Sequence, residues 1–102
     1  GRPDEWKAAE LYREAAEKGE PTACYNIGNC YLNGSGVKRN ASEGILWIRK
    51  SANAGHMGAC GHLSFIYEEG LLVEKDPVEA AFWREQAASF GNKYSMKQTA
   101  LY

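Results

Sequence analysis

A period of 36 residues runs through the chain and constrains its fold more than any other feature. Gly19, Gly55 and Gly91 follow one another at this interval and close the similar phrases LYREAAEKG, WIRKSANAG and WREQAASFG. The match continues between the glycines, with the pairs Ala23 and Ala59, Cys24 and Cys60, Tyr31 and Tyr67, Gly34 and Gly70, and Glu43 and Glu79. A fixed period of about 20–50 residues is typical of stacked repeat proteins, so we predict a solenoid.

Composition limits the classes of partner. The chain has 102 residues, 44% of them hydrophobic, which is enough for one compact core. Its formal net charge of −1 argues against nucleic acid or an anionic membrane as the main partner. No stretch approaches the roughly 18 apolar residues of a membrane span, so we expect no membrane insertion. The three cysteines cannot all pair within the chain, and we expect reduced thiols and a cytoplasmic location, with the endoplasmic reticulum lumen or secretion as the alternative.

Each module is predicted to contain two helices. Ala23, Ile27 and Tyr31 recur at the spacing of one helical face. Gly28 falls in the middle of this helix, where glycine costs about 1 kcal/mol relative to alanine. We therefore expect a neighbouring helix to approach closely at Gly28.

The helix ends carry recognisable signals. Gly34 and Gly70 are expected to end their helices in the left-handed conformation. Asn40 and Asp76 are each followed three residues later by a glutamate, which is typical of a capped helix start. The predicted all-α chain has no strand and contains six helices, over residues 4–18, 21–33, 41–54, 57–69, 77–90 and 92–101.

Equivalent positions of the modules also predict the core. Ala16, Ala52 and Ala88 share one position, where a small side chain lets adjacent helices approach. Trp47 and Trp83 share another and are expected to pack in the interior.

The whole chain, 1–102, is predicted to be a single repeat domain. Residues 1–19 form the second helix of a preceding repeat, 20–55 and 56–91 are complete repeats, and 92–102 form the first helix of a further repeat. Neither end carries the polar cap that solenoids need, so we expect either a fragment of a longer protein or self-association through the uncapped ends.

The repeated phrase resembles the Sel-1-like repeat, a 36-residue relative of the tetratricopeptide repeat. The positions that carry the resemblance in the first full module are Ala23, Gly28, Tyr31, Gly34, Gly36, Val37, Trp47, Ala52 and Gly55. The resemblance covers nearly the whole chain and implies a right-handed α-solenoid that serves as an adaptor or scaffold. One cysteine-rich branch of the family joins cysteines eight residues apart. Here Cys24 and Cys60 match one partner, but Ala16 and Ala52 occupy the other, so that branch's disulfide and activity are not implied.

The same resemblance implies where a partner would bind, because the first helix of each tetratricopeptide-like module lines the concave face. The candidate partner-binding residues are Tyr25, Asn26, Asn29, Phe65 and Lys97. Tyr25 and Phe65 are aromatic anchors of the type enriched at interface hot spots. Asn26 and Asn29 could hydrogen-bond a peptide backbone. The alternative interpretation is an ordinary solvated face, with Phe65 packed on a neighbour.

Neither a catalytic nor a metal site is predicted. His56 and Cys60 are one helical turn apart, whereas His62 lies about 200° around the helix from Cys60, so these residues cannot close a zinc site or form a nucleophile pair. Asn33 and Asn40 match the glycosylation acceptor pattern, but helix capping already explains Asn40. We predict no catalytic residues, no metal and no cofactor.

The sequence therefore predicts a non-enzymatic protein–protein interaction scaffold or adaptor that binds a peptide or partner helix in the concave groove. The alternative is a substrate-docking or regulatory segment of a larger enzyme such as a kinase.

Overall fold

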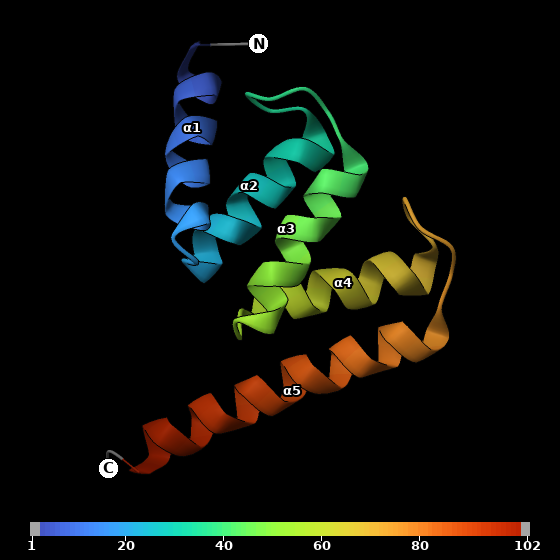
Figure 1. Ribbon diagram of the computed structural model, residues 1–102. Helices are drawn as coiled ribbons and strands as arrows, with labels where there is room; N and C mark the ends of the chain where they lie inside the picture. The colour runs from blue at the N-terminus through green and yellow to red at the C-terminus, as the bar shows by residue number, and fades with distance from the viewer. Residues whose placement is uncertain (1–2, 101–102) are drawn as a thin grey trace.

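The computed structural model describes the backbone of residues 3–100 and the side chains of residues 3–91. This part of the chain consists of helices joined by turns and loops, without strands (Figure 1). Its helices are α1 (Pro3–Glu17), α2 (Pro21–Asn33), α3 (Ala41–Asn53), α4 (Met57–Glu69) and α5 (Pro77–Ala100). Each helix packs against the next in the chain, as expected of a solenoid. The all-α repeat architecture is confirmed, and the first four helices begin and end within one residue of their predicted limits.

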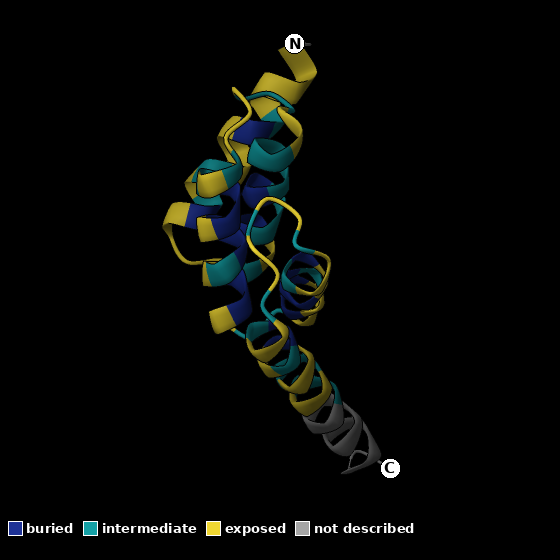
Figure 2. Cartoon of the chain, turned by 90° about the vertical axis from the view of Figure 1, so that its right-hand side faces the viewer, coloured by how far each residue is buried: buried dark blue, intermediate teal, exposed yellow. Residues whose placement is uncertain are grey.

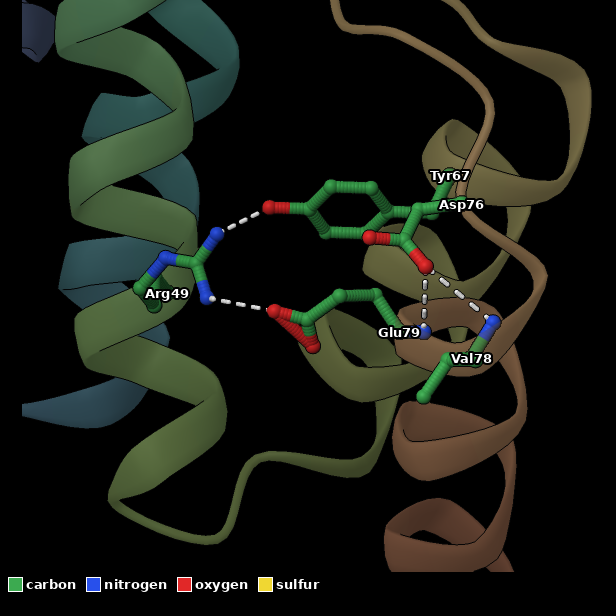
Figure 3. A network of polar contacts seen from close by, with 5 residues as sticks. All are labelled: Arg49, Tyr67, Asp76, Val78 and Glu79. Atoms are coloured by element: carbon green, nitrogen blue, oxygen red, sulfur yellow. Dashed lines mark hydrogen bonds and ion pairs between the residues drawn. The ribbon is translucent and has the colours of Figure 1, made fainter.

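The predicted helix ends are confirmed for the two helical hairpins. Gly34 and Gly70 take left-handed conformations with φ of 72° and 69°, and their N–H groups donate to carbonyl oxygens of α2 and α4. Asn40 Oδ1 accepts a hydrogen bond from the N–H of Glu43 at 3.1 Å. Asp76 Oδ1 accepts from the backbone N–H groups two and three residues later, both at 3.1 Å (Figure 3).

The predicted turn at Gly91 is wrong. The chain forms one helix from Pro77 to Ala100 where we expected separate helices over 77–90 and 92–101. Gly19 and Gly55 do turn, with φ of 88° and 95°, and the helix after each packs back against the one before it. Glycine within a helix costs only about 1 kcal/mol, so a turn there depends on such packing.

The burial of the three equivalent alanines depends on whether the chain turns after them. Ala16 and Ala52 are buried, and the thiols of Cys24 and Cys60 on the returning helices lie 3.6 Å and 3.7 Å from their carbonyl oxygens. Ala88 is exposed, because α5 continues past the position at which the earlier modules turn. Close packing at this position is therefore confirmed for two modules and wrong for the third.

The interior consists of two clusters that each join three helices. Trp47 belongs to the first, together with Ala9, Ala16, Ala23, Cys24 and Ile27. Trp83 belongs to the second, together with Ile45, Ile48, Ala52, Ala59, Cys60 and Leu63. Only 8% of Trp47 and 4% of Trp83 is exposed, which confirms their predicted core positions. Buried positions, dark blue in Figure 2, lie on the inner sides of the helices and continue from one module to the next.

The two helices of the first hairpin, α2 and α3, cross at glycine. A Cβ added to Gly28 would lie 2.6 Å from Cγ1 of Ile48 and 2.9 Å from the carbonyl oxygen of Gly44. A Cβ on Gly44 would lie 2.8 Å from the carbonyl oxygen of Gly28, so the two backbones face each other directly. In the second hairpin the equivalent Ser64 donates from Oγ to the carbonyl oxygen of Ala80 at 2.9 Å. The predicted close approach at Gly28 is confirmed.

Gly36 lets the α2–α3 loop, residues 34–40, pack directly against the backbone of α1. Gly36 has φ of 75°, and a Cβ there would collide with the carbonyl oxygen of Glu5. Leu72 takes its place in the second module, with the similar φ of 65° and an exposed side chain. Left-handed backbone costs a residue with a Cβ roughly 1–2 kcal/mol, so the second loop is the more strained of the two.

We predict that Gly28→Ala lowers the free energy of unfolding by about 1–3 kcal/mol, the usual cost of overpacking, because the opposing backbone cannot rotate away as a side chain would. Gly61→Ala is the matched control, since Gly61 is exposed in the middle of α4 and a Cβ there would meet nothing within 4 Å. This control should stabilise by up to about 1 kcal/mol. Urea melts that rank the two variants in the opposite order would contradict the close crossing.

We predict that Trp47→Ala and Trp83→Ala each destabilise the protein by about 3–5 kcal/mol, because a large aromatic leaves a core cluster. Trp6→Ala serves as the control, since 54% of Trp6 is exposed on α1. It should change the unfolding free energy by less than about 1 kcal/mol. A loss of that small size for either buried tryptophan would exclude its role in the core.

Candidate functional site

The candidate partner-binding residues lie on α2 and α4, the first helices of the two modules. Tyr25, Asn26 and Asn29 belong to α2, and Phe65 belongs to α4. We refer to these four residues as the α2–α4 face. Lys97, the fifth candidate, lies outside the residues whose side chains the structure describes.

Tyr25 joins the two modules. Its half-buried ring stacks on His56, with centroids 4.9 Å apart and planes 29° apart, and it meets His62 edge-on at 5.8 Å. Tyr25 also packs against the second core cluster. Its removal would therefore disturb the fold as well as any binding surface.

The two histidines have structural roles, as expected once a metal site was rejected, but their particular contacts were not predicted from the sequence. His56 precedes α4 and caps it, with Nδ1 accepting from the N–H of Ala59 at 3.0 Å. Burial lowers the pKa of His62, so its imidazole is neutral at pH 7. His56 lies just outside α4, so its direction does not follow the helical spacing that was used to separate Cys60 from His62. Both histidines can therefore contact the ring of Tyr25. The capping position of His56, one residue before the predicted helix, was the available signal.

Polar groups without internal partners stand beside this aromatic contact. Asn26 and Asn29 are half-buried, and their amides make no hydrogen bond to any other described side chain or backbone group. Neither amide is sealed from solvent, in contrast to Nε1 of the two buried tryptophans. Phe65 occupies the repeat position of Asn29, and 52% of it is exposed. The α2–α4 face thus combines an accessible aromatic ring with unpaired amide donors and acceptors.

A second feature, not predicted from the sequence, is a basic cavity of about 460 Å³ between α1 and the α2–α3 loop. Its lining residues are Arg13, Tyr31, Val37, Lys38, Arg39 and Asn40. The guanidinium of Arg13 lies over the ring of Tyr31, 5.3 Å from its centroid. The recurrence of arginine and tyrosine at the equivalent positions 49 and 67 was the signal for this arrangement.

Chemistry by cysteine or metal finds no support in the described geometry. Burial raises the pKa of all three thiols, which keeps them protonated and poorly nucleophilic at neutral pH. Among the residues whose placement is described, no three histidine, cysteine or acidic side chains gather in a way that could hold a metal ion. No helix in this part of the chain is both long and apolar enough to cross a bilayer.

We predict that the native protein contains three free thiols. Cys24 and Cys60 are buried in different clusters, each with its thiol directed to a carbonyl oxygen, and Cys30 is half-buried. Thiol titration after denaturation without reductant should count all three. A count of one would demonstrate an intramolecular disulfide and contradict this arrangement.

Comparison with known proteins agrees with the architecture. The sequence profile of the Sel1 repeat family matches residues 1–20, 21–56 and 58–92. A Sel1 repeat protein from Oxalobacter formigenes superposes with a TM-score of 0.80 at 32% identity, covering 94% of this chain and 39% of that one. A protective antigen present in uropathogenic Escherichia coli strains, which displays an SLR fold, superposes with a TM-score of 0.78 at 36% identity, covering 92% of this chain and 20% of that one. The chain therefore spans well under half of either relative, and no curated protein sequence matches it.

Proposed function

The chain belongs to the Sel1 repeat family, and we propose that it is a non-enzymatic scaffold that binds a peptide or partner helix across the α2–α4 face. Sel1 repeats generally serve as protein-interaction scaffolds. The observations that carry the proposal are the exposed ring of Phe65 on α4 and the amides of Asn26 and Asn29 on α2, which have no internal partner within the described part of the chain.

This combination suits a peptide ligand. An aromatic ring supplies a large apolar contact at low entropic cost, and aromatic residues are enriched among interface hot spots. Each asparagine amide offers two donors and an acceptor, which matches the alternating N–H and C=O groups of a backbone. Half-buried amides are also held in place by their surroundings, so that less side-chain freedom is lost on binding.

The stacking of Tyr25 on His56 supports the proposal indirectly. It joins α2 to the residue that caps the start of α4 and so helps to hold the two first helices in place. A preorganised surface binds at lower entropic cost than a flexible one. We further propose a cytoplasmic location, which three cysteines that form no disulfide favour over an oxidising compartment.

We predict that Phe65→Ala weakens binding of the physiological partner by at least about 2 kcal/mol without unfolding the protein. The partner would be captured with wild-type protein, identified by mass spectrometry and then measured by calorimetry. Phe82→Ala is the matched control, because 46% of Phe82 is exposed but it lies on α5, outside the α2–α4 face. Its affinity should equal that of the wild type.

Two polar variants refine this test. Tyr25→Phe preserves the stacking on His56 and removes only the hydroxyl, whereas Asn29→Ala removes an amide that has no internal partner. Both should remain folded, and Asn29→Ala should weaken binding. Unchanged affinity in Phe65→Ala and Asn29→Ala together, with thermal melts like the wild type, would exclude the α2–α4 face as the binding surface.

A further inference from the structure

The basic cavity combines three cationic side chains in one hollow. Arg13 comes from α1, and Lys38 and Arg39 come from the α2–α3 loop, whose tip reaches toward α1 (Figure 1). Gly36 holds this loop so close to α1 that no side chain would fit between them. The cationic groups are therefore brought together by the backbone, and their grouping is a property of the fold.

The charges in the cavity are not neutralised from within. Arg13 lies over the ring of Tyr31, and Nε of Arg39 donates to the carbonyl oxygen of Leu32 at 3.1 Å. Within residues 3–91, no carboxylate comes within 4 Å of the charged nitrogens of Arg13, Lys38 or Arg39. Even the glutamates one turn before and after Arg13 on α1, Glu10 and Glu17, form no ion pair with it.

The second module contains the same framework with its charges paired. Arg49, the equivalent of Arg13, donates a hydrogen bond to the hydroxyl of Tyr67 and forms an ion pair with Glu79 at 3.9 Å (Figure 3). Its guanidinium lies over the Tyr67 ring, 5.7 Å from the centroid, as Arg13 lies over Tyr31. The second module thus shows that a carboxylate, that of Glu79, pairs with the arginine at this repeat position.

The first module has the equivalent glutamate, Glu43, but no described carboxylate pairs with Arg13 there. Glu74 and Asp76 stand where the first loop has Lys38 and Asn40, so the sign of the charge around the arginine is reversed. Glu43, at the position of Glu79, makes no ion pair. The first module therefore exposes an arginine site that the second fills with its own side chain.

We infer that the basic cavity binds an acidic segment of a protein partner, with a partner carboxylate taking the place that Glu79 takes beside Arg49. The guanidinium fork favours bidentate contact with a carboxylate, and Lys38 adds a second charge beside it. A peptide fits better than a nucleic acid, because the positive charge is confined to one hollow while the chain as a whole carries −1 and would repel a long polyanion. The inference deepens the proposed scaffold function and rests on it for the nature of the partner.

The test is an NMR titration of the ¹⁵N-labelled protein with a synthetic peptide that carries consecutive glutamates between Gly-Ser flanks. The expected result is a set of saturable shifts at the amides of residues 34–40, weakened by added salt and absent with the glutamine version of the peptide. Shifts that do not saturate at millimolar peptide, or that are equal for both peptides, would overturn the inference.

Variants locate the effect. Arg13→Ala and Lys38→Ala should each weaken the affinity for the glutamate peptide about tenfold, the loss expected for one charge-assisted contact. Lys38→Glu, which gives the first loop the charge found in the second, should abolish binding. Lys7→Ala and Lys75→Ala remove one positive charge each outside the cavity and should bind as the wild type does. Because Lys38 is exposed, its variants keep the test valid even if Arg13→Ala fails to fold.

Further arms separate this inference from its competitors. A phosphoserine peptide or an oligothymidine that binds residues 34–40 more tightly than the glutamate peptide would overturn the assignment to carboxylates. Phe65→Ala should bind the glutamate peptide as the wild type does, since it alters only the α2–α4 face. If Phe65→Ala loses the partner and the cavity does not bind the glutamate peptide, this inference is refuted and the proposed function stands. If Phe65→Ala keeps the partner and the cavity binds the glutamate peptide, only the α2–α4 face is refuted.

Discussion

The rest of the structure depends on how closely the two helices of a hairpin cross. At Gly28 and Gly44 the two backbones meet with no side chain between them. At this distance Ile48 reaches the cluster on one side of α3 while Trp47 reaches the cluster on the other side. The α2–α3 pair thus contributes side chains to both core clusters, which is how a stack of small modules obtains a continuous core. The second hairpin maintains the same contact through the hydrogen bond from Ser64 to Ala80.

Much of this fold could be predicted from the sequence, because the determining signals are local and recur. Left-handed glycines, Asn40 and Asp76 as caps, and paired tryptophans each specify a structure from a few neighbouring residues. The continuous helix through Gly91 could not be predicted in the same way. Gly19 and Gly55 carry the same local signal, but their turns depend on a helix that packs back over a buried alanine. Whether that packing occurs is a tertiary property, which the phrase around the glycine does not contain.

The candidate site was predictable only in part, for similar reasons. The repeat predicted that Asn29 and Phe65 lie on the first helices of their modules, and the structure has them on α2 and α4. The contact of Tyr25 with His56 and His62 joins two modules, and no pattern within one module reports it. The basic cavity was harder to foresee, because it depends on a loop held against α1 and on carboxylates that fail to reach Arg13.

Comparison of the two modules separates framework from function. Positions at which the modules agree, such as those of Trp47 and Trp83, serve packing, because both modules must bury the same faces. Positions at which they differ are free of that demand, and both candidate surfaces contain such positions: Asn29 is replaced by Phe65, and Lys38 by Glu74. Arg49 shows the consequence most clearly, since a residue shared with the first module is satisfied internally by Glu79. Both modules contain this arginine and this glutamate, yet the two pair only in the second, where the loop beside them is acidic (Glu74) and not basic (Lys38). Loop residues of a repeat protein can thus change the surroundings of a shared arginine without disturbing the helix crossing beneath it.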